Sequence, residues 1–394
     1  MKIKVRSGDS LWYYSQLFMV PINLVIDSNP QVDPSSLQIG QSIQIPGFHT
    51  STIKLQKGDS LWQIASKNNL PVDALLLLNQ QLQPQNLQVN QTVLVPTRVI
   101  MPLMDRKKSY SFKTLQDDLN QLKEVYPFIK INEIGYSVTG KPLYEIRIGT
   151  GEKQVHYNAS FHANEWITTP VLMSLINAYL LSMTNAKPLR GIETLPYYSR
   201  VELSVVPMVN PDGVDLVLGG PPEGYKEEIL AINEQKDDFS LWKANIRGVD
   251  LNKQYPAKWE YEKERKPDVP SSRDFPGYEP LSEPEAIAMA NLVENNNFSL
   301  LLAFHTQGEE FYWGYEGLEP PDSKVIADEF ERVSGYRSVQ YVDSFAGFRD
   351  WFIKEYRRPG FTMELGKGVN PLPLSQYEDM YEEMLGVFLA SLYL

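Results

Sequence analysis

The chain contains no cysteine among its 394 residues. This absence excludes disulfides, thiolate metal sites and cysteine nucleophiles, although it leaves the cellular compartment open. Long apolar runs are also missing, since no stretch approaches the roughly 20 residues that a membrane-spanning helix needs. The first residues lack the uninterrupted apolar segment of a classical signal peptide. We therefore expect no membrane insertion, and export that is either unconventional or preceded by removal of a leader.

Positive charge is scarce as well. The chain carries 37 lysines and arginines against 49 aspartates and glutamates, a net charge of −12. The first 100 residues hold a slight excess of positive charge, so the acidity belongs to the rest of the chain. Such a surface has no general attraction for nucleic acid or anionic lipid. We expect no nucleic-acid partner, and any acidic substrate must be met by a local basic pocket.

The length exceeds that of a single hydrophobic core, and the N-terminal 97 residues contain a tandem repeat. The segment Gly8–Trp12 (GDSLW) recurs 50 residues later as Gly58–Trp62. The same offset of 50 residues relates Pro21 to Pro71, Asn29 to Asn79, Pro34 to Pro84 and Pro46 to Pro96. Each copy predicts a short strand, a helix with Asp-Ser at its N-cap, a second helix after the first proline, and a closing strand.

This repeat, with GDSLW at its front and an LQxGQxxxIP-like segment at its back, resembles the LysM module. The resemblance implies two small βααβ modules, at residues 1–47 and 51–97, that bind N-acetylglucosamine-containing glycans such as peptidoglycan or chitin. A structural unit without a ligand is the alternative. We expect the Leu-Trp pairs to lie in the module cores rather than to contact sugar; these residues are Leu11, Trp12, Leu61 and Trp62.

Residues 98–110 are predicted to be a linker into a third domain at residues 105–394. Helices are predicted near residues 111–125, 167–182, 283–296, 322–334 and 375–392. Strands are predicted near residues 129–135, 143–149, 154–160, 201–208, 299–304 and 361–364. Alternation of this kind indicates an α/β domain with a mostly parallel or mixed sheet that helices cover on both faces.

Histidine is rare, with four residues in the chain. His49 falls in the predicted linker between the repeats and His156 within a strand, so both are interpreted as structural. His162 and Glu165 follow the strand that ends at residue 160, and His305 follows the strand 299–304. Ligands of open α/β sheets lie outside the carboxyl ends of strands. Two histidines and one glutamate leave the fourth position of a tetrahedral zinc to water, as in a catalytic site.

A hydrolytic zinc site also needs a carboxylate that takes up and returns a proton. Glu364 ends the strand 361–364 at the same edge of the predicted sheet, and we interpret it as this catalytic base. An ordinary surface glutamate is the alternative. A different divalent metal would accept the same ligands as zinc.

Taken in order, HxxE, NPDG, GVDLN, a histidine at a strand end and a glutamate after an aromatic strand resemble the zinc carboxypeptidases of the pancreatic carboxypeptidase A type. The resemblance covers about residues 105–394 and implies a mixed eight-stranded sheet flanked by helices, with one zinc ion. It implies that Asp212 orients the first zinc histidine and that Tyr341 is the mobile active-site tyrosine. An Asp-Gly turn is the alternative for Asp212.

Three positions depart from the digestive enzymes of that family. The pair that holds the substrate's terminal carboxylate is Asn252-Lys253 instead of Asn-Arg, and Lys243 replaces the arginine that polarises the scissile carbonyl. Because lysine lacks the planar fork of arginine, strict recognition of a free peptide C-terminus is not expected. Arg349, two residues before Trp351, would make the specificity pocket favour an anionic group, unless it only pairs with a nearby carboxylate.

The whole arrangement resembles the bacterial γ-D-glutamyl-L-diamino acid endopeptidases. It implies hydrolysis of the γ-amide between D-Glu and meso-diaminopimelate or lysine in peptidoglycan stem peptides, with Lys243, Lys253 and Arg349 as candidates for the substrate's carboxylates. A conventional metallocarboxypeptidase and a non-catalytic wall-binding protein are the alternatives. The expected location is a bacterial cell wall or spore, or the cytoplasm until release, and a sporulation role and a wall-recycling role both stay open.

Overall fold

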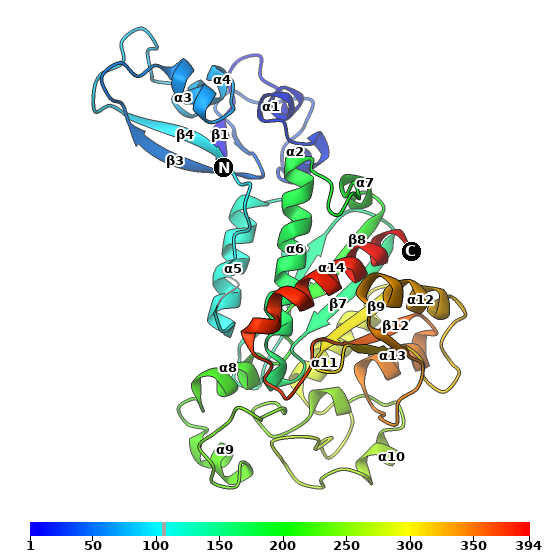
Figure 1. The fold of residues 1–394 in the computed structure, drawn as a ribbon. Coiled ribbons are helices and arrows are strands. Elements are labelled where there is room, and N and C mark those ends of the chain that lie inside the picture. Colours follow the sequence, from blue (N-terminus) through cyan, green and yellow to red (C-terminus); the bar gives the residue numbers. More distant parts are fainter. Residues whose placement is uncertain (105–107) are drawn as a thin grey trace. The chain divides into compact units, whose positions relative to one another are not determined.

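The computed structural model describes residues 1–104 and 108–394 (Figure 1). The chain forms two compact units. The first comprises Met1–Leu103, Asp118–Lys130 and Asn177–Leu195, and the second comprises Met104–Asp117, Ile131–Ile176 and Pro196–Leu394. Residue 105, at which the third domain is predicted to begin, lies outside the described residues. The domain boundaries drawn from the repeat and the motifs remain predictions.

Each repeat folds in the predicted order of strand, helix, helix and strand. The first contains β1 (Lys2–Lys4), α1 (Leu11–Phe18), α2 (Ile22–Asp27) and β2 (Ser42–Gln44). The second contains β3 (Phe48–Lys54), α3 (Leu61–Lys67), α4 (Val72–Leu78) and β4 (Thr92–Arg98). The strands of each repeat pair in antiparallel fashion. The prediction for His49 is wrong in one respect, because His49 lies within β3, opposite Thr97, and not in a linker.

Serine caps the first helix of each repeat, as predicted. Ser10 Oγ accepts a hydrogen bond from Tyr13 N at 3.1 Å. Ser60 Oγ accepts one from Gln63 N at 3.2 Å, and the Gln63 side chain completes a capping box. These bonds satisfy backbone N–H groups that the first helical turn leaves without an intrahelical partner.

The prediction for the two tryptophans of the repeats is wrong. Leu11 and Leu61 are buried in the module cores, but Trp12 and Trp62 are 65% and 70% exposed. The reason is helical geometry: successive residues are rotated by about 100° around the axis, so a residue that follows a core-facing leucine points away from the core.

The two repeats are joined by a charged contact. The guanidinium of Arg6 donates to both carboxylate oxygens of Asp73, with Nη1–Oδ1 and Nη2–Oδ2 distances of 2.8 and 2.6 Å. Tyr13 donates to the same carboxylate. The positions that match Arg6 and Asp73 in the other copy are Gln56 and Asn23. Each module therefore contributes a different position of the repeat to this contact, and neither position carries a charge in the other copy.

Eight strands form one mixed sheet in the order β11-β10-β12-β9-β7-β8-β6-β5, which confirms the predicted fold class. Their bounds are β5 (Lys130–Tyr136), β6 (Pro142–Ile148), β7 (Lys153–Ala159), β8 (Val201–Val206), β9 (Phe298–His305), β10 (Glu310–Tyr312), β11 (Arg337–Val339) and β12 (Gly360–Glu364). The central strands β12, β9, β7 and β8 are parallel, whereas β10 and β6 run antiparallel to their inner neighbours. The three-residue strands β10 and β11 are too short to give a periodic signal and were not predicted.

The helices are α5 (Phe112–Val125), α6 (Thr168–Asn185), α7 (Leu195–Tyr198), α8 (Pro211–Gly219), α9 (Lys226–Ile232), α10 (Trp259–Lys263), α11 (Pro284–Glu294), α12 (Asp322–Ser334), α13 (Phe348–Tyr356) and α14 (Tyr377–Tyr393). Neighbouring residues of β7 point to opposite faces of the sheet. The ring of His156 contacts Phe348 of α13, and the ring of Tyr157 contacts Phe388 of α14. Helices therefore cover both faces, as the alternation of elements predicts.

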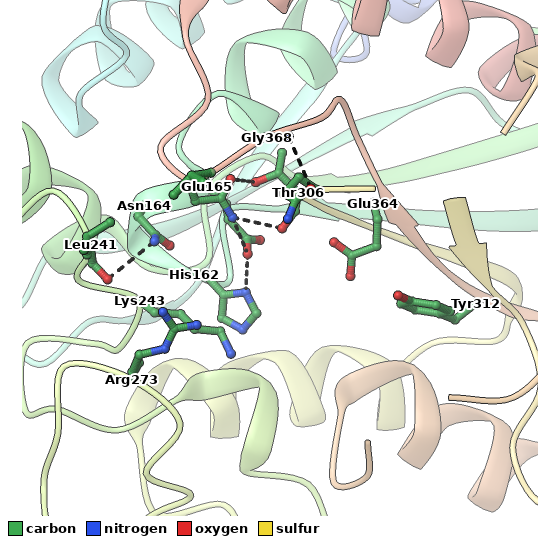
Figure 2. Close-up of a pocket in the computed structure, with 13 residues that line it drawn as sticks. His162, Asn164, Glu165, Leu241, Lys243, Arg273, Thr306, Tyr312, Glu364 and Gly368 are labelled. Carbon is green, nitrogen blue, oxygen red and sulfur yellow. Dashed lines mark hydrogen bonds and ion pairs between the residues drawn. The ribbon is translucent and has the colours of Figure 1, made fainter. Parts of the chain in front are cut away.

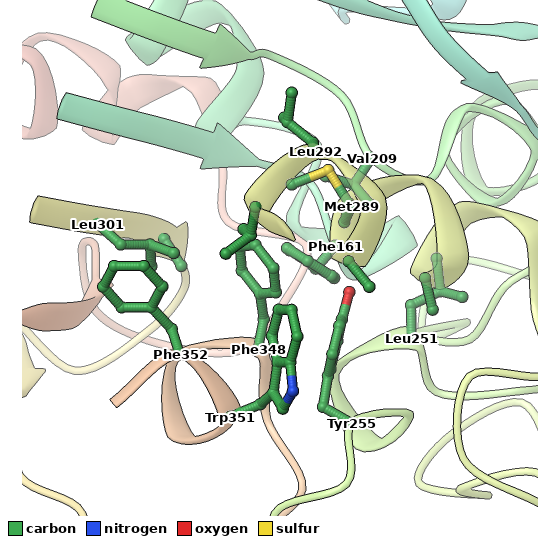
Figure 3. Close-up of a cluster of buried hydrophobic side chains, with 14 of the residues drawn as sticks. Phe161, Val209, Leu251, Tyr255, Met289, Leu292, Leu301, Phe348, Trp351 and Phe352 are labelled. Carbon is green, nitrogen blue, oxygen red and sulfur yellow. The ribbon is translucent and has the colours of Figure 1, made fainter. Parts of the chain in front are cut away.

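An aromatic cluster lies beneath the carboxyl edge of the sheet (Figure 3). Phe161 packs on Phe348 with ring centroids 5.3 Å apart, and Tyr255 packs on Phe348 at 5.1 Å and on Trp351 at 5.5 Å. All four side chains are buried. Because Phe161 directly precedes His162, the cluster holds the start of the loop that carries the predicted metal ligands.

The sequence analysis expected no apolar stretch of membrane-spanning length, but within the described residues one helical stretch, Ala163–Asn185, is long and apolar enough to cross a membrane. Of its apolar window, 89% is buried inside the fold. A core helix of a globular protein has the same composition, so this stretch is weak evidence for a span.

Candidate active site

The predicted metal ligands lie at the carboxyl ends of neighbouring parallel strands. The chain leaves β7 at Ala159, and His162 begins a short 3₁₀ helix, Ala163–Glu165. His305 is the last residue of β9 and lies directly opposite Glu364, the last residue of β12. Strand register therefore brings together two residues that are far apart in the sequence.

The three side chains converge on one point. Nδ1 of His162 lies 2.9 Å from Oε1 of Glu165, and Nδ1 of His305 lies 2.9 Å from Oε2 of the same carboxylate. The two Nδ1 atoms are 3.2 Å apart. All three residues are buried, and their ligand atoms lie within 4.8 Å of one another. Two imidazole nitrogens and one carboxylate form the ligand set of a catalytic zinc, so these residues fit that metal.

Charge in the site favours a cation. Burial opposes ionisation of Glu165, but His162 and His305 outweigh it and hold the pKa of this carboxyl well below its usual value. Burial also lowers the pKa of His162, but attraction to Glu165 and Asp250 dominates and raises it to about 9. Burial and then repulsion by Glu165 raise the pKa of Glu364 to about 8. In the absence of a metal the site thus retains protons that a divalent cation would displace.

Asp250 is the carboxylate that orients the first histidine. Its Oδ1 lies 3.2 Å from Nε2 of His162 and accepts a hydrogen bond from Asn252 N at 3.0 Å. Its Oδ2 accepts a hydrogen bond from Lys243 Nζ at 2.7 Å. A partner on the second ring nitrogen sets the tautomer and the direction of the ligating one. Asp250 belongs to the GVDLN motif, which the sequence analysis recognised. The motif did not indicate that this aspartate orients His162.

The prediction that Asp212 orients His162 is therefore wrong. Oδ2 of Asp212 accepts a hydrogen bond from Thr139 N at 2.9 Å, and Thr139 Oγ1 donates to Oδ1. Lys141 Nζ lies 3.4 Å from Oδ1. Asp212 stands in the first turn of α8, whose N-cap is Asn210. It anchors the turn between β5 and β6, and the Asp-Gly turn proposed as the alternative is instead a helix start.

Two cations lie on one side of the metal ligands (Figure 2). Lys243 Nζ is held between Asp250 and Asp274, at 2.7 and 3.0 Å. Burial lowers the pKa of Lys243, but the two carboxylates outweigh it and hold the pKa above the usual value. Arg273, which the sequence analysis missed, pairs with Asp274 at 3.2 Å and lines the same cavity. It lies in a loop with no motif around it, so no sequence signal marked it.

His162, Glu165 and Glu364 face a cavity of about 380 Å³. Its lining residues are His162, Asn164, Glu165, Leu241, Lys243, Arg273, Thr306, Gln307, Tyr312, Glu364, Gly368, Val369 and Asn370. Glu364 and Tyr312 also line a second cavity, of about 230 Å³. Of the predicted substrate-binding residues, Asn252 and Arg349 line this second cavity. Tyr312 and Asn370 were not predicted.

Arg349 is buried and pairs with Asp350 through Nε, at 3.0 Å, and through Nη2. Its Nη1 is buried and has no hydrogen-bond partner among the described residues. Arg349 therefore forms the ion pair that the sequence analysis gave as the alternative, and its binding of an anionic substrate group stays a prediction.

Lys253 and Tyr341 lie elsewhere than predicted. Lys253 Nζ donates to Glu262 Oε1, Ser344 Oγ and Phe345 O at 2.6, 2.6 and 3.0 Å, and it lines neither cavity. Tyr341 is exposed and donates to Glu319 at 2.8 Å. It lines a third cavity, of about 420 Å³, which also includes Arg349. Lys253 was misplaced because its burial depends on Glu262, which no motif marked.

Comparisons with known proteins agree with this geometry. The zinc carboxypeptidase family model matches residues 115–385, and the LysM domain model matches residues 3–46 and 53–96. The chain is 56% identical to gamma-D-glutamyl-L-diamino acid endopeptidase 1 of Lysinibacillus sphaericus over 396 aligned positions, which cover 100% of both chains.

Solved structures share the fold. Bovine thrombin-activatable fibrinolysis inhibitor is 19% identical, with a TM-score of 0.57 over 73% of this chain and 97% of that one. Carboxypeptidase A from Helicoverpa armigera is 17% identical, with a TM-score of 0.55 over 88% of this chain and 97% of that one. The chain belongs to the zinc carboxypeptidase family of metallopeptidases and carries two LysM domains at its N-terminal end.

Proposed function

We propose that the protein is a zinc-dependent peptidoglycan peptidase that hydrolyses the bond between γ-D-Glu and an L-diamino acid, meso-diaminopimelate or lysine, in stem peptides. The 56% identity to an endopeptidase of that name over the full chain supports the substrate class. Within the site, the observation that carries the proposal is Arg349, which lines the same cavity as Glu364 and whose buried Nη1 has no hydrogen-bond partner among the described residues. Such a donor favours a substrate with an anionic group beside the scissile amide.

We assign one zinc ion per chain to His162, Glu165 and His305. When bound, zinc polarises the scissile carbonyl and lowers the pKa of water. Its positive charge also favours the ionised form of Glu364, whose pKa in the metal-free site is about 8. Glu364 then accepts the proton of the attacking water on its carboxylate and returns it to the leaving amine.

Other residues bind and orient the substrate. Lys243 lies beside His162 and offers positive charge to the scissile carbonyl. Arg349 and Asn252 line the next cavity, where the diamino acid would bind. Asp250 holds His162 and Lys243 at once, so it couples the metal ligand to the carbonyl-polarising cation. We do not extend a catalytic role to Tyr341 or a substrate-binding role to Lys253, because both have other partners.

The LysM domains would bind the N-acetylglucosamine-containing glycan and hold the catalytic domain near its substrate. Such binding agrees with association of the protein with a bacterial cell wall. There the enzyme would degrade wall material, either during sporulation or in wall recycling. Sedimentation with insoluble peptidoglycan tests it. We expect the full chain to sediment with the wall material, and a chain that remains in the supernatant would contradict the glycan assignment.

The substrate is tested with L-Ala-γ-D-Glu-meso-diaminopimelate and mass spectrometry of the products. We expect release of L-Ala-D-Glu in the presence of zinc and none after removal of the metal with a chelator. A blocked dipeptide with a free C-terminal L-amino acid is the comparison substrate. Hydrolysis of that dipeptide without cleavage of the muropeptide would favour a conventional carboxypeptidase and reject the proposal.

The role of Glu364 is tested with Glu364→Gln. The variant should keep zinc but lose at least the ~10²–10⁴-fold that acid-base catalysis contributes. A variant that retains zinc and full turnover would remove Glu364 from the mechanism, and it would separate this role from the metal site itself.

A further inference from the structure

Arg273 keeps hydrogen-bond donors for a ligand in the first cavity, the one of about 380 Å³ that the metal ligands face. The lysine and arginine residues in its lining are Lys243 and Arg273. Lys243 Nζ already donates to Asp250 and Asp274, at 2.7 and 3.0 Å. Arg273 uses only Nε, which donates to Asp274 at 3.2 Å, and its two terminal nitrogens have no hydrogen-bond partner among the described residues. The planar fork of the guanidinium is therefore available to an acceptor.

The backbone on both sides of Arg273 is held in place. Ser272 O accepts a hydrogen bond from Lys243 N at 2.8 Å, and Phe275 O accepts one from Asp250 N at 2.7 Å. These bonds tie the loop that carries Arg273 to the segment that carries the lysine and the aspartate of the active site. A side chain on a backbone that is fixed in advance loses less conformational freedom when a ligand binds. The guanidinium thus has a defined place beside Lys243.

The first cavity has two ends relative to the metal ligands. Figure 2 shows Glu364 and Tyr312 on one side of His162, and Arg273 and Leu241 on the other. Glu364 and Tyr312 also line the second cavity, to which the proposed function assigns the diamino acid. A substrate whose scissile amide lies over the metal ligands therefore places its acyl part at the end that Arg273 lines.

A γ-linked D-Glu residue brings a free carboxylate to that end. Its side-chain carboxyl forms the scissile amide, so its α-carboxylate stays ionised, separated from the scissile carbonyl by the β- and γ-methylene groups and the α-carbon. A residue that is linked through its α-carboxyl has no such group unless its side chain is acidic. A carboxylate is the acceptor that the two terminal nitrogens of an arginine match in a bidentate manner.

We propose that Arg273 is a specificity-determining residue that binds the free α-carboxylate of the D-Glu residue and so selects γ-D-glutamyl substrates. The proposal rests on the proposed function. It makes Arg273, which is 58% exposed, a substrate contact on the side of the metal opposite the diamino acid. An ion pair of an exposed arginine lies at the low end of the roughly 10–100-fold that a charged hydrogen bond contributes, so we expect about tenfold.

The experiment compares L-Ala-γ-D-Glu-meso-diaminopimelate with the same peptide in which an amide replaces the α-carboxylate of D-Glu. With the full-length zinc enzyme, kcat/KM for the carboxylate peptide should exceed that for the amide peptide about tenfold. A ratio below about threefold, or a preference for the amide, would overturn the inference and leave the proposed function standing. Cleavage of neither peptide would reject the proposed function itself.

Variants at Arg273 locate the contact. Arg273→Gln should lower kcat/KM for the carboxylate peptide about tenfold and leave that for the amide peptide within about twofold, so that the preference disappears. Arg273→Lys keeps the charge without the fork and should show an intermediate preference. Arg332→Gln is the matched control, because Arg332 is exposed, pairs with Glu329 and lies outside the three cavities. It should leave both values unchanged. A preference that persists in Arg273→Gln, or an equal fall for both peptides, would overturn the assignment.

Discussion

Replacement of Asp250 by asparagine should weaken zinc binding, whereas the same replacement at Asp212 should not. The Asp250 carboxylate faces Nε2 of His162 at 3.2 Å with one oxygen and accepts from Lys243 at 2.7 Å with the other. An asparagine of the same shape has one acceptor and one donor. It must therefore point its NH₂ group either at the ammonium of Lys243 or at the imidazole nitrogen that has to carry a proton.

The expected loss follows from the role of such partners. Removal of the group that orients a metal-binding histidine costs 10–100-fold in metal affinity, or roughly 1.4–2.7 kcal/mol. Asp212 interacts with Thr139 and Lys141 and not with His162, so Asp212→Asn is the matched control. Its effect should appear in thermal stability and not in zinc affinity.

The assay is competition for zinc with a chromophoric chelator at neutral pH, after circular dichroism has shown that both variants are folded. We expect a zinc dissociation constant 10–100-fold higher for Asp250→Asn and within about twofold of the parent protein for Asp212→Asn. Equal affinities for parent and Asp250→Asn, or a larger loss in Asp212→Asn, would refute the reasoning and return the orienting role to the NPDG motif.

Three further outcomes are expected. Burial raises the pKa of Glu285 to about 8 in the folded protein. The stability that its protonated form contributes is therefore complete below pH 4.5 and is lost as the pH rises through about 8. In urea unfolding between these pH values, the free energy of unfolding of Glu285→Gln should depend less on pH than that of the parent protein, by up to ~1.4 kcal/mol per pH unit. A double-mutant cycle on Arg6→Ala and Asp73→Ala should give a coupling free energy of about 0.5–1 kcal/mol. Added salt should reduce this coupling, because both side chains are about one-third exposed. Zero coupling at low salt would show that the contact does not join the modules. Phe348→Ala should lower the free energy of unfolding by about 3–5 kcal/mol in chemical unfolding. The reason is that the ring of Phe348 is buried against three aromatic side chains of the cluster in Figure 3. A loss below about 1 kcal/mol would mean that the cluster closes around the gap that the substitution leaves.

The exposed tryptophans show where local reasoning reaches its limit. The GDSLW motif predicts a serine-capped helix, and both copies form one. The motif does not say which of its two apolar residues faces the core. That depends on the phase of the helix relative to the short strands, and the structure buries Leu11 and Leu61 and exposes Trp12 and Trp62.

Much of the fold and the metal ligands could be predicted because their signals are local. The repeat is visible as identity at a fixed offset, helices as apolar periodicity with caps, and buried strands as apolar runs. His162 and Glu165 are three residues apart, and His305 and Glu364 each end a predicted strand. Since parallel strands of one sheet end at the same edge, the sequence by itself determined the fold class, the convergence of His162, Glu165 and His305, and the place of Glu364 at the end of the neighbouring strand.

Only the tertiary structure decided how the charges around that set are paired. His162 and Asp250 are 88 residues apart in the chain, and the sequence analysis assigned the role of orienting His162 to Asp212 instead. Lys253 could have faced substrate, but Glu262, Ser344 and Phe345 satisfy it. A buried charge must find its partner within a few ångströms, and which partner lies there is set by how distant loops pack rather than by any pattern along the chain.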